Sequence, residues 1–437
     1  SEDEVYQAME ALIYNLNSMH SRAGAQVPFS SINLGTDTSP EGRLITRSLL
    51  LAHERGLGRG ETPIFPNILF RLKKGVNLEP GDPNYDLFQL AMRVAAKRLN
   101  PTFAFMDSSF NSQYGEEVSY MGCRTRVIAN RHGAEVSTGR GNLSFTTINL
   151  PRLGIKAHGN LERFYNELDK VIILAGRQLY HRFRVQSKLK VKDMPFLMGQ
   201  HLFLDSEKLG PDDPIGPVIK HGTLSVGFIG LAETLTALNG AHHGQDLGSQ
   251  QLGLEIISHM RQRIDEMAEE YDLNYTLLAT PAEGLSGRFV AIDRKIFGEI
   301  PGITDKEYYT NSFHIPVEYD ISCFDKINLE APYHSLTNAG HISYVEFSSP
   351  PIDNIEAFEN IVKHMAESDM GYAGINFPID ECRSCGKQGI FESECSSCGS
   401  TDIRRVRRIT GYLSTVDRFN DAKKAELSDR KAHIKGE

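Results

Sequence analysis

The sequence contains no apolar run of about 18 residues, the length that a membrane-spanning helix needs. Its first residues, SEDEVYQAMEAL, are acidic and amphipathic, which is not the pattern of a signal peptide. Positive charge is not in excess either, because the formal net charge is −9. A general nucleic-acid binder would usually be basic. We therefore expect a cytoplasmic protein whose partners are neither membranes nor nucleic acids.

The chain also lacks internal repeats of fixed period and low-complexity runs. With 40% hydrophobic and 24% charged residues, it has the composition of a folded, soluble protein. A length of 437 residues would suggest two or three domains, although a large barrel can extend over that length as one unit. The sequence begins without an initiator methionine, inside a helix-like pattern, so we expect a fragment of a longer chain.

Cysteine is scarce, and four of the six cysteines are clustered as C-x2-C-x9-C-x2-C. The cluster consists of Cys382, Cys385, Cys395 and Cys398. Two paired thiolates on tight turns suit tetrahedral zinc, and a glycine follows the second cysteine of each pair. Four protein ligands leave no open position, so a zinc ion here would be structural. Two disulfides or an iron–sulfur cluster are the alternatives that this pattern leaves open.

Short apolar runs alternate with helical patterns along the rest of the chain. We predict strands at 29–35, 63–73, 275–280 and 288–293. We predict helices within 158–190, 221–238 and 249–272. Strands that alternate with helices favour an α/β fold, with either a largely parallel sheet or an α/β barrel.

Near the C-terminus, one glycine is explained by neither a helix cap nor a tight turn. Gly411 lies between a basic run at 404–408 and Tyr412. Glycine is used where no Cβ fits or where the backbone itself must be approached closely. Residues 408–412 read RITGY, which resembles the RVxGY signature of glycyl radical enzymes with isoleucine in place of valine. On its own, so short a match would not distinguish Gly411 from an ordinary loop glycine.

The context of Gly411 makes the resemblance specific. The cysteine cluster precedes it and DRFNDAKKAELSDRKAH follows, which resembles the C-terminus of the anaerobic (class III) ribonucleotide reductases. Further stretches resemble that family in the expected order: NLNSMHSRAGAQVPFSSINLGTDTS, GVNLEPGDPNYDLF, YMGCRTRV, GRGNLSFTTINLPRLGI, TPAEGLSGRF, YYTNSFHIPV and GYAGINFPID. The N-terminal part of the family, with its ATP-binding cone, first barrel strands and a second active-site cysteine, has no counterpart in this sequence.

The resemblance implies an α/β fold, namely a ten-stranded barrel of two antiparallel five-stranded halves, of which we expect the N-terminal part to be missing. We expect the partial catalytic barrel at 1–375, the four-cysteine zinc ribbon at 376–403, and the glycyl radical loop with its tail at 404–437. Cys123, in YMGCRTRV, is implied to lie at the tip of a finger loop and to become a thiyl radical; a lone cysteine is otherwise usually a small buried side chain. Cys323 lies in no matching motif, and we interpret it as structural.

The implied reaction is the anaerobic reduction of ribonucleoside triphosphates to deoxyribonucleoside triphosphates. A radical-SAM activating enzyme, with a 4Fe–4S cluster and S-adenosylmethionine, would remove hydrogen from Gly411. Gly411 would then take hydrogen from the Cys123 thiol, and the thiyl would remove the ribose 3′ hydrogen. Formate is the implied reductant, nucleotide effectors (ATP and dNTPs) and a homodimer are also expected, and we interpret the basic run as a solvated or partner-docking face.

Six residues are candidates for binding substrate: Asn142, Thr280, Ala282, Glu283, Asn311 and His314. The segment 280–283 follows a predicted strand, where backbone donors can hold a polyphosphate. Asn142 is the nearest match to a family asparagine that helps to position formate. Plain structural hydrogen bonding is the alternative for each of these residues, and a turn beside Gly141 is the alternative for Asn142.

Two rival functions account for part of the same pattern. Another glycyl radical enzyme, a lyase or dehydratase, would share the glycine signature and barrel but usually lacks the four-cysteine ribbon. Acyl-transferring members also place two cysteines side by side, whereas Cys123 stands alone. A zinc-ribbon binding protein is the second rival, and the acidic net charge and the long remainder of the chain argue against it.

Overall fold

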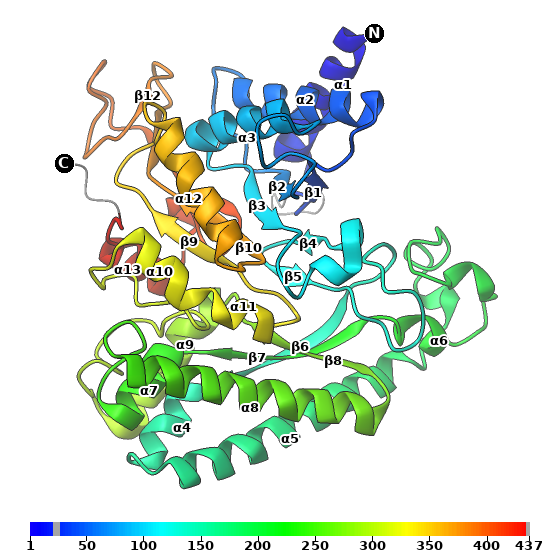
Figure 1. Ribbon diagram of the computed structural model, residues 1–437, viewed down its shortest axis with the longest axis vertical. Coiled ribbons are helices and arrows are strands. Elements are labelled where there is room, and N and C mark those ends of the chain that lie inside the picture. Colours follow the sequence, from blue (N-terminus) through cyan, green and yellow to red (C-terminus); the bar gives the residue numbers. More distant parts are fainter. Residues whose placement is uncertain (21–26, 434–437) are drawn as a thin grey trace.

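The computed structural model describes residues 1–20 and 27–433 and is an α/β protein with two main sheets (Figure 1). The first sheet consists, in spatial order, of β1 (Ser31–Leu34), β2 (Asn67–Leu72), β3 (Thr102–Phe105), β10 (Tyr372–Asn376) and β9 (Ser343–Glu346). β1, β2 and β3 are parallel, β10 is antiparallel to β3, and β9 is parallel to β10. The strands predicted at 29–35 and 63–73 are therefore confirmed.

Five helices contribute to the apolar core on this sheet: α1 (Glu2–Ser18), α2 (Pro40–Arg55), α3 (Tyr85–Arg98), α10 (Cys323–Glu330) and α12 (Ile355–Glu367). α2 begins at a clear start signal, because the Ser39 hydroxyl accepts from Gly42 N at 3.1 Å and proline follows at the first helical position. Cys323 lies in this core and is 4% exposed, as expected of a structural cysteine.

The second sheet is fully parallel and consists of β6 (Asn142–Asn149), β7 (Thr223–Ile229) and β8 (Asn274–Ala279). Its crossovers and flanks are α4 (Leu150–Ala157), α5 (Leu161–Gln186), α6 (Gly216–Ile219), α7 (Leu231–Asn239), α8 (Leu247–Tyr271), α9 (Glu283–Phe297) and α11 (Pro332–Leu336). The helices predicted within 158–190 and at 249–272 correspond to α5 and α8, and the strand predicted at 275–280 corresponds to β8.

Two secondary-structure predictions in this region are wrong. Residues 223–229 form β7 rather than the first part of a helix, and all seven residues are buried. A strand buried on both faces is a continuous apolar run, which periodicity alone does not separate from a buried helix. Residues 288–293, predicted as a strand, lie inside α9, whose buried residues Ser286, Val290 and Asp293 recur at helical spacing.

A short hairpin links the two sheets and lies between them in Figure 1. It comprises β4 (Tyr120–Met121), β5 (Thr125–Arg126) and the turn 122–124. On one side, Asn33 of β1 donates through Nδ2 to Tyr120 O at 2.9 Å. On the other side, Thr125 forms an isolated bridge with Gly340, which also bridges Leu278 of β8. The hairpin is thus fixed by both sheets.

The α/β class is confirmed, whereas the closed ten-stranded barrel and the domain boundaries stay predictions. Within 1–20 and 27–433, the main sheets have five and three strands, and the bridges of Gly340 connect the hairpin with the three-stranded sheet. Residues 21–26, which belong to one of the motifs quoted above, and 434–437, the end of the predicted tail, lie outside the described residues. In the part that the structure describes, no helix has the length and apolar character needed to cross a membrane.

The C-terminal part forms a third, four-stranded sheet. In spatial order it contains β12 (Gln388–Gly389), β11 (Ile379–Cys382), β13 (Ile403–Arg408) and β14 (Leu413–Thr415), and α13 (Asp421–Asp429) follows. All of its pairings are antiparallel. The turn between β13 and β14 contains Gly411.

The basic run on β13 is not a solvated or docking face, so that interpretation is wrong. Arg404 donates to Glu381 at 2.6 Å, and Arg405 and Arg407 donate to Asp380 at 2.9 and 2.8 Å. The Asp380 side chain is fully buried. Because β13 pairs with β11, the arginines lie across from carboxylates and their charges stabilise the sheet internally.

Candidate active site

The hairpin turn brings Cys123 to the interior of the molecule. Gly122 adopts a φ of 57°, which allows the tight turn. Asn67 of β2 donates through Nδ2 to Gly122 O at 3.1 Å, so the first sheet holds the turn directly. Cys123 is partly buried and its neighbour Arg124 is 1% exposed. Cys123 therefore lies at the tip of the β4–β5 hairpin, and its place in a catalytic finger loop stays a prediction.

Gly411 lies against the backbone of Cys123. A Cβ added to Gly411 would lie 2.2 Å from Cys123 O and 2.7 Å from Cys123 Cα, distances that real Cβ atoms do not adopt. Gly411 is buried and has no positive φ, so backbone conformation does not require glycine at this position. The close approach does require it. The two residues singled out from distant parts of the sequence are thus in contact.

The segment around Gly411 is held by donors from three parts of the chain. Arg124 donates through Nη2 to Thr410 O at 2.7 Å, and Tyr344 of β9 donates its hydroxyl to the same oxygen. Arg408 donates through Nη1 to Gly411 O at 3.2 Å. Both carbonyl groups next to the Gly411 Cα therefore have charged or phenolic donors, which fix the plane of the backbone there.

A carboxylate on α9 clamps the residues on both sides of Gly411. Glu283 accepts from the Thr410 hydroxyl through Oε1 and from the Tyr412 hydroxyl through Oε2, each at 3.0 Å. The backbone N–H of Ala282, at the start of the same helix, donates to Asn311 Oδ1 at 2.8 Å. The loop predicted to bind substrate phosphates is thus adjacent to the Gly411 turn.

The environment of Cys123 keeps its thiol protonated. Burial, together with the negative charge of Glu283, raises the pKa of Cys123 to about 11. The Thr410 hydroxyl lies 4.0 Å from Cys123 Sγ. At neutral pH the sulfur therefore retains its hydrogen, whereas a cysteine acting as a nucleophile or metal ligand needs a lowered pKa. An S–H group is what hydrogen-atom transfer requires.

Thr280 and Asn142, two of the candidate substrate-binding residues, lie at opposite ends of the second sheet. Thr280 follows β8, and its hydroxyl lies 3.1 Å from that of Thr147, near the carboxyl end of β6. Asn142 begins β6 and donates to Thr223 and Ser225. Because β6 is extended, Asn142 lies on the order of 15 Å from the end that holds Thr280. The described contacts do not bring Asn142 to Glu283.

Asn311 and His314 are both buried beside this centre. Asn311 accepts from Ala282 and donates to Glu426 of α13 at 3.3 Å. Burial lowers the pKa of His314 to about 4, and its Nε2 lies 2.7 Å from Ile342 O. His314 is therefore neutral at pH 7 and is a hydrogen-bond donor rather than a cation.

Three functional contacts were not identified from the sequence. Arg124 is adjacent to Cys123 in YMGCRTRV, which was the available signal for it. Arg408 was grouped with the basic run, although it is 1% exposed and binds the Gly411 carbonyl. No local pattern marks Tyr344, because its position depends on the pairing of β9 with β10.

The four clustered cysteines fit a tetrahedral metal ion. Cys382 Sγ lies 3.6 Å from Cys398 Sγ, and Cys385 Sγ lies 3.6 Å from Cys395 Sγ. All four sulfur atoms lie within 4.8 Å of one another. Zinc–sulfur bonds of about 2.3 Å give sulfur–sulfur distances of about 3.8 Å in a tetrahedron. All six cysteines are free, so the disulfide alternative is wrong.

Comparisons with known proteins agree on one family. A profile described as "Anaerobic ribonucleoside-triphosphate reductase" matches residues 1–433. The chain is 38% identical over 450 residues to the protein of that name from Escherichia coli strain K12. The alignment covers 99% of this chain and 62% of the relative, so the chain spans less than two thirds of that protein's length.

Solved structures share the fold. An anaerobic ribonucleotide reductase matches with a TM-score of 0.75 and 16% identity, over 99% of this chain and 68% of that one. The Thermotoga maritima enzyme in complex with dATP and CTP matches with a TM-score of 0.70 and 17% identity, over 97% and 69%. The B12-independent glycerol dehydratase from Clostridium butyricum matches with a TM-score of 0.69 and 8% identity, over 100% and 62%.

These identities to solved structures support the fold alone, whereas the family profile spans nearly the whole chain. The predicted glycine and cysteine positions and the four-cysteine cluster agree with that assignment. The chain belongs to the anaerobic ribonucleoside-triphosphate reductase family.

Proposed function

We propose that the protein containing this chain reduces ribonucleoside triphosphates to 2′-deoxyribonucleoside triphosphates by glycyl and thiyl radical chemistry. The observation that carries the proposal is the contact between Gly411 and Cys123. Hydrogen-atom transfer needs its two partners within van der Waals distance, and this contact supports such a transfer between the two loops. The protonated thiol of Cys123 is the matching hydrogen donor.

The reaction starts when a radical-SAM activating enzyme removes the Cα hydrogen of Gly411. Gly411 regains hydrogen from the Cys123 thiol once nucleotide is bound. The resulting thiyl takes the ribose 3′ hydrogen, and the 2′ hydroxyl leaves as water. Formate supplies the two electrons and is oxidised to carbon dioxide. Overall, one ribonucleoside triphosphate, formate and a proton give the deoxyribonucleotide, carbon dioxide and water.

The residues around the pair have supporting roles in this proposal. Glu283, between Thr410 and Tyr412, holds the turn and accepts a hydrogen bond or proton at the ribose side of the site. Thr280 and the start of α9 receive the phosphates, because helix N-termini present unpaired N–H groups to anions. Asn311 and His314 orient that loop, and Asn142 remains the candidate for positioning formate.

The four-cysteine cluster holds zinc in this proposal and has a structural role. It would fix the ends of β11 and β13, and β13 leads directly into the Gly411 turn. Zinc is favoured over an iron–sulfur cluster because the sulfur–sulfur distances suit a single tetrahedral ion.

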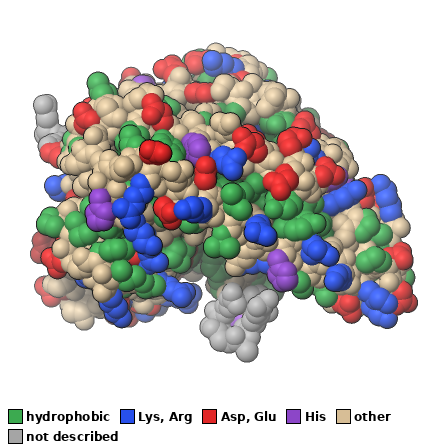
Figure 2. Space-filling view, turned by 90° about the horizontal axis from the view of Figure 1, so that it is seen from below, with side chains coloured by type: hydrophobic (Ala, Val, Ile, Leu, Met, Phe, Trp, Pro, Cys, Tyr) green, Lys and Arg blue, Asp and Glu red, His purple; other side chains and the backbone are tan. Residues whose placement is uncertain are grey.

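Nucleotide effectors, a homodimer and a cytoplasmic location complete the proposal. The related Thermotoga maritima enzyme was solved with dATP bound in its specificity site, which supports effector binding in the family. α5 exposes Leu161, Ile173, Leu174 and Val185, apolar side chains that a second copy could cover. Figure 2 views the molecule from this side, and hydrophobic side chains lie there among acidic and basic ones.

A dehydratase is the second candidate, because a glycerol dehydratase has the same fold. The family assignment and the four-cysteine cluster favour the reductase.

The decisive test is electron paramagnetic resonance after anaerobic incubation of the full-length protein with its activating enzyme, S-adenosylmethionine and a reductant. We expect a doublet from the Gly411 Cα hydrogen that is lost in Gly411→Ala. Cys123→Ser should keep the doublet and abolish deoxynucleotide formation. A doublet that persists in Gly411→Ala, or product formation by Cys123→Ser, would refute the assignment. Glycerol dehydration without nucleotide reduction would favour the dehydratase.

A further inference from the structure

A cavity of about 440 Å³ is lined in part by Arg407 and Arg408 of β13, the strand that leads into the Gly411 turn. Its wall includes Glu346 and Asn376, the last residues of the parallel strands β9 and β10. The residues that follow α13 close it. The space beyond the carboxyl ends of parallel strands is where α/β proteins commonly bind ligands. Of the residues described around the Gly411 turn, Arg408 also lines this cavity, whereas Cys123, Glu283 and Thr280 do not.

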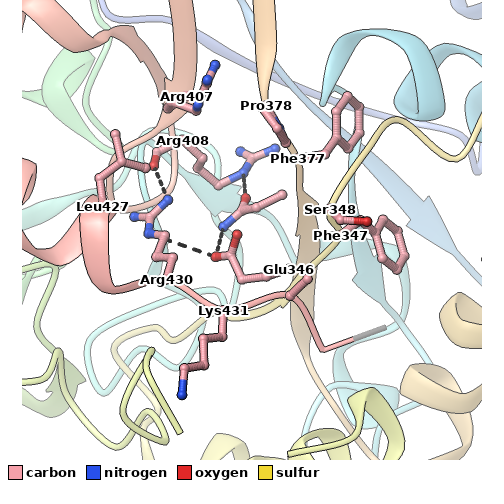
Figure 3. A pocket seen from close by; sticks show the side chains of 12 residues that line it. Glu346, Phe347, Ser348, Phe377, Pro378, Arg407, Arg408, Leu427, Arg430 and Lys431 are labelled. Carbon is pink, nitrogen blue, oxygen red and sulfur yellow. Dashed lines mark hydrogen bonds and ion pairs between the residues drawn. The ribbon is translucent and has the colours of Figure 1, made fainter. Parts of the chain in front are cut away.

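The cavity is lined by four cationic side chains and one carboxylate. The cations are Arg407, Arg408, Arg430 and Lys431, and the carboxylate is Glu346. Figure 3 shows Arg407 and Lys431 at opposite rims, with Arg408, Arg430 and Glu346 between them.

Neighbouring carboxylates do not cancel this positive charge. Asp380 is shared by Arg405 and Arg407. Glu426 is shared in the same way by Lys423 and Arg430. Glu346 accepts from Asn376 at 2.7 Å, and the same Asn376 accepts from Arg408 at 2.9 Å. Asp380 and Glu426 are thus each shared by two cations, and the described cation that pairs with Glu346 is Arg430 at 4.0 Å, so an excess of positive charge remains around the cavity.

One buried hydrogen-bond donor at the cavity is left without an acceptor. The buried Nε–H of Arg430 has no hydrogen-bond partner, and its nearest carboxylate oxygen, on Glu346, lies 4.0 Å away. A buried charged donor without an acceptor is unfavourable. Lys431 is exposed at the rim, and the Ser348 hydroxyl is a further donor in the lining. An anion in the cavity would supply the acceptor that the Arg430 Nε–H lacks, and the positive charge of Lys431 would attract it.

We propose that this cavity binds the phosphate group of a small molecule. A phosphate offers three terminal oxygens to the guanidinium, ammonium and hydroxyl donors, whereas a carboxylate offers two. Phe347, Phe377 and Pro378 form an apolar part of the wall, which suits a ring attached to the phosphate. The proposal concerns binding and is independent of the proposed reaction.

The site is connected to the Gly411 turn by two side chains. Arg430 donates through Nη1 to Arg408 O at 3.0 Å, and Arg408 donates to Gly411 O at 3.2 Å. A phosphate paired with Arg430 therefore holds the segment after α13 against β9 and β10. It also restrains Arg408, and thereby the carbonyl of Gly411.

Isothermal titration calorimetry with inorganic phosphate tests the binding site. We expect saturable binding to the wild-type chain and binding at least about tenfold weaker for Lys431→Gln and Arg430→Gln. Lys424→Gln, an exposed lysine of α13 outside the cavity, is the matched control and should bind as the wild type does. Equal binding by Lys431→Gln and the wild type, or no binding to the wild type, would overturn the proposal. Lys431 supports no described side chain, so its variant is expected to fold.

Two further measurements test the ligand class and the coupling. Phenyl phosphate should bind at least as tightly as inorganic phosphate, and succinate about tenfold more weakly. Equal or tighter binding of succinate would reassign the site to carboxylates. Saturating phosphate should slow amide hydrogen exchange in residues 409–413 of the wild type and not of Lys431→Gln. Binding without any change in that exchange would contradict the coupling to Gly411.

Discussion

At the scale of single residues, Gly411 is defined by contact rather than by conformation. The residue has an ordinary backbone φ, and what excludes a side chain is the carbonyl of Cys123. The neighbouring carbonyl groups are fixed by Arg124, Tyr344 and Arg408. The backbone of Gly411 is thus fixed by close packing against Cys123 on one side and by hydrogen bonds to the flanking carbonyl groups.

Gly411→Ala is expected to destabilise the fold, because its Cβ would collide with backbone that cannot rotate away. Overpacking of this kind costs about 1–3 kcal/mol of unfolding free energy. Gly284→Ala is the matched control, since nothing lies within 4 Å of a Cβ there and alanine favours the helix. Urea unfolding of both variants measures the difference. A stability of Gly411→Ala equal to that of the control would contradict the observed packing.

Arg124→Gln should lower the turnover rate without lowering the yield of the glycyl radical. The change removes the hydrogen bond that Arg124 donates to Thr410 O, so the Cys123 hairpin and the Gly411 turn are held less firmly against each other. We expect the glycyl doublet to form in normal yield while turnover falls by about 100-fold, a typical cost of misplacing a reacting group. Arg126→Gln, in the same hairpin but bonded to Asn111, controls for general damage to the hairpin. Equal losses in the two variants would argue against a positioning role for Arg124.

Sequence patterns identified the residues that meet at the candidate site better than the residues that hold them in place. Gly411, Cys123 and Glu283 each belong to a local motif, and the structure brings all three together. Arg124 and Tyr344 were missed because their roles come from long-range packing. Asn142 begins β6 and so lies at the end of the sheet away from Thr280. A sequence motif alone does not show at which end of a strand a residue lies.

At the scale of elements, the ladder between β11 and β13 holds the Gly411 turn. It is built from charge as well as from backbone hydrogen bonds, since buried Asp380 lies between Arg405 and Arg407. In the sequence, the arginines of β13 form a continuous basic run, whereas their carboxylate partners on β11 do not lie next to that run. The cysteine cluster separates these carboxylates from it, and so the run was misinterpreted.

Asp380→Asn is expected to lower the free energy of unfolding by about 3 kcal/mol, because two arginines lose a buried partner. Asp402→Asn is the control. Asp402 pairs with Arg383 at 3.6 Å at the surface, where such a pair contributes about 0–1 kcal/mol. Denaturant melts of the two variants give the comparison, and similar small losses would mean that the ladder is not held by Asp380.

Removal of metal from the four-cysteine cluster should disorder β11 and β13 while sparing the first two sheets. The four thiolates would repel one another without a cation between them, and the small core there contains Cys382, Phe391 and Cys395. Cys398→Ser should lower the zinc content and increase amide exchange in 379–415. Normal exchange in a metal-free sample would show that the ribbon does not depend on a metal.

The errors in secondary structure have a common cause. β7 and residues 288–293 of α9 are both short stretches rich in apolar residues, and in such stretches the burial pattern is decided by neighbouring elements. Longer periodic segments such as α5 and α8 were predicted correctly, because they repeat the helical period over many turns.

At the scale of the whole molecule, buried histidines make stability depend on pH. Burial lowers the pKa of His243 and His314 to about 4, and of His53 and His334 to about 3. In His334, the Gly371 N–H donates to Nδ1, so Nε2 carries the proton and donates to Ser343. A second proton would leave two donors facing each other.

Acid is therefore expected to destabilise the protein well above the range where carboxylates titrate. Unfolded histidine binds a proton below about pH 6.5, whereas these four stay neutral when folded until about pH 4 or 3. Stability is intact above pH 6.5 and is lost as pH falls from there, by up to about 1.4 kcal/mol per pH unit for each histidine. Urea unfolding at pH 7.5, 6.5 and 5.5 measures the slope. His334→Gln should reduce it, and a flat profile would contradict the neutral state.

The contact between the hairpin tip at Cys123 and the turn at Gly411 also constrains how this sequence can change. Two loops that meet at their ends have coupled lengths, since one inserted residue in either would shift the contact by about 3 Å. Insertions elsewhere, as in the connection between α5 and β7, leave the contact unaffected. Among related chains we therefore expect the lengths of 120–126 and 408–413 to be invariant, while the segment 187–215 varies freely in length.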